Sequence, residues 1–86
     1  MNVILDCEYL YQREQAHEYL AWMLEFPPYY GKNLDALFDC LTELSGCTVK
    51  LIGSEALCRS DSYGARVLKV LEEAAQANPG LKLIIQ

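Results

Sequence analysis

The chain has 86 residues, 52% of them hydrophobic, which is enough for one small core and a single domain over residues 1–86. Twelve acidic and seven basic side chains give a net charge of −5. That charge repels nucleic-acid phosphates, so it argues against direct nucleic-acid binding and favours a basic partner. The sequence has no signal-peptide pattern and no apolar run near the roughly 18 residues of a membrane span. We therefore expect a cytoplasmic protein without membrane contact.

The first part of the chain predicts a strand followed by an amphipathic helix. Val3 to Leu5 is a short apolar run, and helical periodicity extends from about Arg13 to Glu25. His17 is the only histidine, and no nucleophile signature accompanies it. We interpret it as a surface or boundary residue rather than a general base. The core side of this helix is expected to contain Ala16, Leu20, Met23 and Leu24.

The next segment combines a proline-rich aromatic turn with a short helix. Pro27, Pro28 and Gly31 end the preceding helix, and Asn33 is a good N-cap for a helix beginning near Leu34. At about 100° per residue, one side of this helix is apolar, with Leu34, Leu37, Cys40, Leu41 and Leu44. The other side is polar and mostly acidic, with Asp35, Asp39, Thr42 and Glu43.

The carboxylates on the acidic side of this helix repel one another and lower the stability of the helix. Asp35, Asp39 and Glu43 follow one another at i, i+4 and i+8, where like charges cost roughly 0.2 to 0.5 kcal/mol per pair. A solvated face is the simplest interpretation of such a charge run. Its aromatic neighbours favour an interface instead, because aromatic side chains beside fixed charges are typical of interface anchors. These neighbours are Tyr29, Tyr30 and Phe38, and we expect one tyrosine to be buried and the other presented.

The second half of the chain continues the alternation of helices and strands. Gly46 is expected to stop the acidic helix, and Gly53 follows a strand. The expected segments are a strand at 48–52, a helical turn near 54–58, a polar loop at 59–62, a helix at 64–77, a turn at 78–80 and a strand at 81–85. Strands separated by helices imply parallel pairing. The prediction is a small three-layer α/β domain, with a three-stranded parallel sheet flanked by helices.

The four cysteines show no metal-binding or redox spacing. Cys7, Cys40, Cys47 and Cys58 form no CxxC pair and no Cys-His set typical of zinc sites. Without export, disulfides are not expected. We interpret Cys40 as a buried free thiol and assign no redox role to any of the four.

Residues 27–42, with the pattern PxYYGxNLDALxDCLT, resemble the barstar family of intracellular inhibitors of barnase-type bacterial ribonucleases. The similarity extends more weakly over the whole chain, because the strands and helices follow the order of that family. In the family, the turn and second helix plug the ribonuclease active site. Their carboxylates take the place of RNA phosphates among its Lys, Arg and His side chains. The resemblance also implies the fold expected above.

The resemblance assigns roles to individual residues. It implies the main anionic contact at Asp39, a supporting one at Asp35 and an aromatic contact at Tyr29. The family's further acidic contact matches Glu73, with Glu72 as the weaker choice. The full expected contact set is Tyr29, Tyr30, Gly31, Asn33, Leu34, Asp35, Phe38, Asp39, Thr42, Glu43 and Glu73.

Some positions depart from the family pattern. Phe38 stands where the best-known member has tryptophan, which keeps a ring and loses an indole N–H. Glu43, Leu44 and Ser45 make the end of the binding helix bulkier and more acidic. Lys32, in the middle of the turn, would slightly oppose a basic partner. These differences bear on which ribonuclease is recognised.

Two functions follow from these observations. The first is a cofactor-free, non-enzymatic, 1:1 inhibitor of a barnase-like, guanyl-preferring extracellular ribonuclease. The alternative is a barstar-like regulatory module that binds another basic protein. An enzyme using Asp35, Asp39 and Glu73 to bind Mg²⁺ is a weaker hypothesis, because carboxylates one turn apart usually need additional oxygen ligands. The expected site therefore contains no catalytic residue and no metal.

Overall fold

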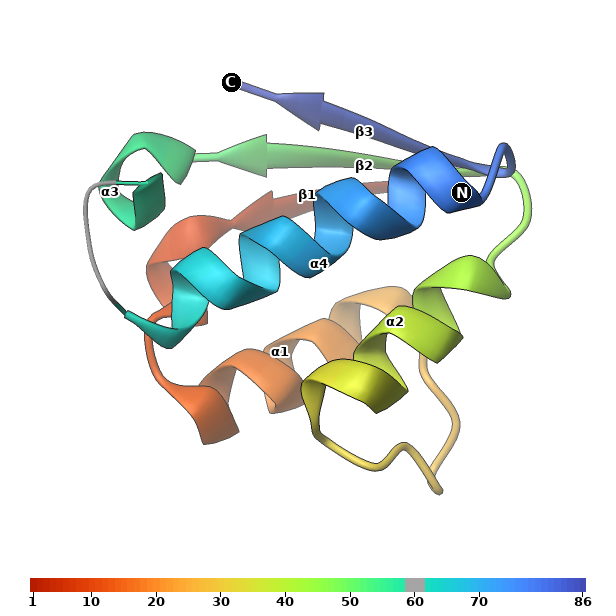
Figure 1. Cartoon of the computed structure of the whole chain (residues 1–86), viewed down its shortest axis with the longest axis horizontal. Helices are drawn as coiled ribbons and strands as arrows, with labels where there is room; N and C mark the ends of the chain where they lie inside the picture. Colours follow the sequence, from red (N-terminus) through yellow and green to blue (C-terminus); the bar gives the residue numbers. More distant parts are fainter. Residues whose placement is uncertain (59–61) are drawn as a thin grey trace.

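A computed structural model describes residues 1–58 and 62–86 of the chain (Figure 1). The elements lie close to the predicted ranges, and the short helix expected near 54–58 is present. Of the polar loop expected at 59–62, residues 59–61 lie outside the described residues. In chain order the elements are β1 (Asn2–Asp6), the 3₁₀ helix η1 (Cys7–Leu10), α1 (Arg13–Leu24), α2 (Leu34–Thr42), β2 (Cys47–Ile52), α3 (Ser54–Cys58), α4 (Tyr63–Ala77) and β3 (Leu81–Ile85).

The three strands form one parallel sheet in the order β1-β2-β3. Val3 is in register with Val49, and Val49 with Leu83. These three apolar residues therefore form one row across the three strands. Each connection between neighbouring strands contains helices, as parallel pairing requires. The predicted α/β class and three-stranded parallel sheet are confirmed.

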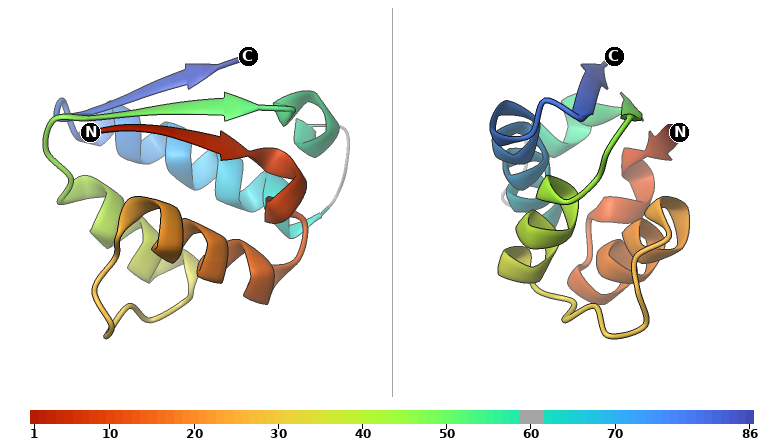
Figure 2. Two further views of the ribbon diagram at one scale, coloured as in Figure 1. Left: turned by 180° about the vertical axis from the view of Figure 1, so that it is seen from behind. Right: turned by 90° about the vertical axis from the view of Figure 1, so that its right-hand side faces the viewer.

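The layers differ from the expectation in one respect. The helices lie on one face of the sheet rather than flanking it on both sides, as the right-hand view of Figure 2 shows. Right-handed crossovers that step in one direction across a parallel sheet all cover the same face. Side chains on the other face are therefore open to solvent, and Ile4 is 55% exposed there. Within the helical side, α2 packs mainly on α4, and α1 packs beside β1 and α4.

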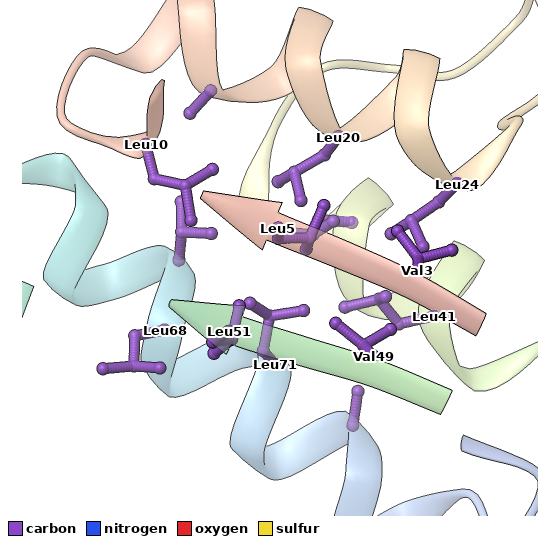
Figure 3. Close-up of a cluster of buried hydrophobic side chains, with 14 of the residues drawn as sticks. Val3, Leu5, Leu10, Leu20, Leu24, Leu41, Val49, Leu51, Leu68 and Leu71 are labelled. Atoms are coloured by element: carbon purple, nitrogen blue, oxygen red, sulfur yellow. The ribbon is translucent and has the colours of Figure 1, made fainter. Parts of the chain in front are cut away.

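The hydrophobic core fills the space between the sheet and the helices (Figure 3). Alternate residues of β1 and β2 point inward and are buried, whereas their neighbours are exposed or half-buried. The helices contribute rows of leucine at helical spacing. The buried residues drawn together in Figure 3 include Val3, Leu5, Leu10, Leu20, Leu24, Leu41, Val49, Leu51, Leu68 and Leu71.

The described cysteines contribute to packing. Cys7 and Cys47 are buried, and Cys40 is half-buried rather than fully buried as expected. No disulfide joins these three residues, and the Cys58 side chain lies outside the described part of the structure. Burial raises the pKa of the Cys40 thiol, and Glu43 and Asp39 nearby add to the effect. Within the residues described, no helix is long and apolar enough to cross a membrane.

Candidate functional site

The segment between α1 and α2 forms a tight turn that presents Tyr29. The backbone N–H of Tyr30 donates to the carbonyl of Pro27 at 3.0 Å, closing a β-turn with Pro28 and Tyr29 at its centre. Proline fixes the backbone at the first central position and stiffens the turn. The Tyr29 side chain is 84% exposed. The turn therefore presents one aromatic ring on a backbone that is already ordered, so little conformational entropy is lost when a partner binds it.

Tyr30 points the opposite way and anchors the turn in the core. It is only 7% exposed, and its ring packs on Phe26 with centroids 4.9 Å apart. Its hydroxyl lies 2.5 Å from Nδ1 of His17, whose Nε2 lies 2.6 Å from the hydroxyl of Tyr63. One hydrogen-bonded row thus joins the turn, α1 and the start of α4. The prediction that one tyrosine is buried and the other presented is confirmed.

The prediction that His17 lies at the surface or a boundary was wrong. The side chain is fully buried, with both ring nitrogens bonded to tyrosine hydroxyls. Burial lowers its pKa, and the nearby cations Arg13 and Lys32 add to this effect. Burial also raises the pKa of Tyr30, whose hydroxyl faces the ring. The neutral imidazole is consequently a structural link between the turn and two helices.

The start of α4 approaches η1 closely enough to require glycine. A Cβ added at Gly64 would lie 2.7 Å from the carbonyl oxygen of Leu10 and 2.4 Å from Cδ2 of Leu57. This close approach lets the first turn of α4 bring Tyr63 to His17. Gly64 therefore helps to position Tyr63 and His17, which hold the turn, although Gly64 itself is not part of the exposed surface.

The N-terminus of α2 is fixed by Asn33, as predicted. Its side-chain oxygen accepts the backbone N–H of Ala36 at 2.7 Å, and the helix begins at Leu34. Lys32, directly before the cap, has a φ of +53°, a left-handed conformation that costs a residue with a side chain roughly 1 to 2 kcal/mol. The capped helix starts immediately after the turn. The position of Tyr29 relative to the α2 carboxylates is therefore fixed.

The C-terminal end of α2 is tied to the turn after α4. The side-chain amide of Asn78 donates to the carbonyls of Leu41 at 2.9 Å and Leu44 at 2.7 Å. These bonds satisfy two carbonyl groups at the end of the helix. Asn78 is buried, so the tie is shielded from water. The two hydrogen bonds from Asn78 therefore fix the orientation of α2 relative to α4.

Side chains of α2 and α4 surround a surface hollow that carries three carboxylates. Asp35 and Asp39 come from α2, and Glu73 comes from α4. All three are exposed, and within the described part of the chain none has an ion-pair partner. The hollow is also lined by Leu34, Phe38 and Val70. Half-buried Phe38 thus lines the same hollow as the acidic groups, while Glu72 does not line it.

A second hollow lies between α2 and the turn. It is lined by Tyr29, Tyr30, Gly31 and Glu43, and it shares Asp39 with the acidic hollow. Asp39 is therefore the one carboxylate of α2 that borders both the Glu73 side and the Tyr29 side. This central place could not be read from helical spacing alone, because it depends on the position of the turn.

The comparisons with known proteins agree with this architecture. The whole chain, residues 1–86, matches the family described as Barstar (barnase inhibitor). It is 35% identical, over 89 aligned positions, to a protein of Bacillus subtilis (strain 168) named "Putative ribonuclease inhibitor YrdF". That alignment covers 99% of this chain and 98% of the relative.

The chain belongs to the barstar family. The description of the family and the name of the relative both point to an inhibitor rather than an enzyme. In the described residues of this barstar-family chain, no group of three or more His, Cys, Asp or Glu side chains is arranged to hold a metal ion. The α/β class and the three-stranded parallel sheet implied by the sequence resemblance are observed, with the helices on one face of the sheet.

The remaining predicted contact residues of this barstar-family chain lie around the carboxylates. Thr42 is half-buried, and its hydroxyl donates to the Asp39 carbonyl at 2.9 Å. Asn33 and Leu34 line a third hollow with Asp35. Glu43 follows the last residue of α2 as its C-cap and is exposed. Tyr30 is the exception, because its buried ring and bonded hydroxyl suit it to supporting the turn.

Sequence reasoning missed two residues that hold this surface in place. His17 falls three and seven residues before Leu20 and Leu24, so helical periodicity could have indicated its burial. Asn78 was interpreted only as part of an Asn-Pro-Gly turn. Its bonds to the end of α2 connect distant parts of the chain, and no local pattern indicates them.

Proposed function

We propose that this protein is a stoichiometric inhibitor of a barnase-type ribonuclease and binds the enzyme one-to-one. The turn and α2 enter the enzyme's active site, where Asp39, Asp35 and Glu73 occupy the places of RNA phosphates. Tyr29 and Phe38 contribute aromatic contacts beside them. The membership of the chain in a family of barnase inhibitors supports the proposal.

The single observation that carries the proposal is the convergence of carboxylates from two helices around one hollow. Asp35, Asp39 and Glu73 are exposed there and form no ion pair within the described residues, although Arg13 lines a neighbouring hollow with Asp35. Like charges held together cost stability unless a partner of opposite charge compensates them. An enzyme that binds an RNA backbone carries such cations. The arrangement therefore suits a phosphate-binding cleft.

The rigidity of the surface supports tight binding. Asn33 caps α2 at one end, Asn78 holds the other, and Tyr30 anchors the turn through His17. A surface already arranged for its partner loses little conformational entropy on docking. The net charge of −5 also favours fast encounter with a basic protein.

The proposal is tested by calorimetric titration of the purified protein into a catalytically inactive barnase-type ribonuclease. We expect one-to-one binding that weakens as salt is raised. Asp39→Ala should lower the affinity at least about 30-fold, as for a central interface anchor. Glu43→Ala, a matched carboxylate at the edge, should lower it less than about fivefold.

The outcomes separate the hypotheses. Equal losses in the two variants would remove Asp39 from the centre of the interface. Absence of binding by the unmodified protein to any barnase-type ribonuclease would contradict the proposed function. The function would then be that of a barstar-like module for another basic protein.

A further inference from the structure

The most exposed large hydrophobic side chains of the described structure are Trp22 and Tyr29, at 82% and 84%. Tyr29 belongs to the proposed binding surface, but Trp22 lies on α1 and has no role in it. Trp22 is the only tryptophan of the chain. Exposed tryptophan is uncommon away from contact surfaces, because its large ring gains much from burial. Its position therefore calls for an explanation.

Trp22 lines a groove on the α1 side of the turn. The other residues of this groove are Glu18, Ala21, Phe26, Pro27, Pro28, Tyr30 and Lys32. Glu18 and Trp22 are four residues apart on α1, so they are neighbours on one helix face. Both are exposed. The groove thus combines an accessible aromatic face with a carboxylate one helical turn away.

The groove is continuous with the proposed inhibitory surface. Tyr30 borders it and also borders the hollow that contains Tyr29 and Asp39. The turn at 27–30 therefore lies between two hollows, with the one that contains Tyr29 and Asp39 on one side and the Trp22 groove on the other. A cleft that receives this turn has walls on both sides, so an enzyme bound to Asp39 is placed to reach the groove.

We propose that the same ribonuclease places a cationic side chain, arginine or lysine, against Trp22 and Glu18. This inference rests on the proposed function, because it assumes that the turn enters a basic cleft. The tryptophan face attracts the cation through its ring electrons, and the carboxylate pairs with its charge. Trp22 and Glu18 are then determinants of which ribonuclease is bound.

The charges of the groove support this occupant over a second copy of the chain. A second copy carries the same net charge of −5 and would be repelled. Lys32 also lines the groove, so the attraction for a cation comes from the ring of Trp22 and the carboxylate of Glu18 on α1. Glu14, one turn before Glu18 at the start of α1, is also exposed, and these two carboxylates line a neighbouring hollow with Arg13 and Lys32.

The first test measures affinity for a catalytically inactive barnase-type ribonuclease with Trp22→Ala and Glu18→Gln. Cation–π contacts predict a loss of roughly 3- to 30-fold for Trp22→Ala and a smaller loss for Glu18→Gln. Ile4→Ala and Glu8→Gln are matched controls, because both side chains are exposed on β1 and η1, outside this groove. These controls should bind as the unmodified protein does. Thermal melts verify that each variant is folded.

The second test observes the indole directly. Incorporation of 5-fluorotryptophan labels this chain at Trp22 alone, so tryptophans of the ribonuclease do not contribute to the fluorine spectrum. We expect the resonance to shift on addition of the ribonuclease, and in Asp39→Ala to shift only at a higher ribonuclease concentration, because that variant binds more weakly. An equal dependence of the shift on ribonuclease concentration in the unmodified protein and in Asp39→Ala would contradict binding through one continuous surface.

The failure of this inference is distinguishable from the failure of the proposed function. If the unmodified protein binds and Asp39→Ala binds at least about 30-fold more weakly, the inhibitor assignment stands. Unchanged affinity of Trp22→Ala together with an unmoved fluorine resonance would then overturn the role of Trp22. If the unmodified protein fails to bind, both proposals fail.

Discussion

The two consecutive tyrosines of the turn, Tyr29 and Tyr30, have different structural roles. Tyr29 is exposed and free to contact a partner, whereas Tyr30 is buried with its hydroxyl on His17. The turn geometry separates them, because the Pro27 to Tyr30 hydrogen bond directs one ring outward and the other inward. Substitutions at these neighbours should consequently affect different properties.

Tyr30→Phe should lower the free energy of unfolding by about 1 to 3 kcal/mol, because it leaves a buried His17 nitrogen without its partner. Tyr29→Phe is the matched control and should leave stability unchanged, since its hydroxyl is at the exposed crest of the turn. Urea denaturation followed by circular dichroism measures both. Equal stability of the two variants would contradict the anchoring role of Tyr30.

The buried His17 predicts a dependence of stability on pH. In the folded chain burial lowers its pKa below the ordinary value of 6.5, so the unfolded chain binds the proton first as pH falls. The stability contributed by the neutral ring is therefore fully present above pH 6.5. It is lost as pH falls below 6.5 through the folded pKa. Urea denaturation between pH 7.5 and 5 measures this loss.

His17→Gln provides the comparison for the pH series. Glutamine does not titrate, so the decline just below pH 6.5 should become shallower, whatever the overall stability of the variant. An identical decline in the two proteins would assign the effect to other groups.

At the scale of the elements, α2 is held at both ends by asparagine side chains. Asn33 acts within the local sequence, whereas Asn78 reaches α2 from the turn before β3. Helix ends leave unsatisfied backbone groups, and each asparagine satisfies some of them. The orientation of the acidic face therefore depends on one local and one long-range contact.

Asn33→Ala should lower the free energy of unfolding by about 0.5 to 2 kcal/mol, since the N–H of Ala36 loses its acceptor. Asn33→Asp retains a capping oxygen and should preserve most of the stability. The midpoints of urea denaturation at neutral pH give the comparison. Similar losses in both variants would indicate that the cap contributes little to α2.

At the scale of the whole molecule, no carboxylate of α2 forms an ion pair with a cation among the residues that the structure describes. The net charge of −5 should steer a basic partner over long range. We predict that the association rate constant with a barnase-type ribonuclease falls at least about tenfold from low salt to about 0.5 M salt. The dissociation rate constant should change much less.

Stopped-flow mixing at several salt concentrations measures both rate constants. Asp35→Asn is a useful comparison, because removal of one charge should reduce the salt dependence of association. An association rate that does not respond to salt would contradict electrostatic steering.

The sequence by itself determined the local features of this protein. The N-cap at Asn33 and the apolar spacing of the helices depend on residues within a few positions of one another. For this reason the elements and the α/β class were predictable. The acidic row of α2 was predictable for the same reason, as was a turn with one buried and one exposed tyrosine. The expected stop of α2 at Gly46 was wrong, because the helix ends at Thr42 with Glu43 as its C-cap.

Only the tertiary structure decided which distant residues share a surface. It placed Glu73 beside Asp35 and Asp39, buried His17 between two tyrosines, and brought Asn78 to the end of α2. It also left one face of the sheet uncovered and opened the groove beside Trp22. These features arise from the packing of helices against one another and the sheet. Such packing depends on contacts between segments far apart in the chain, which local periodicity does not encode.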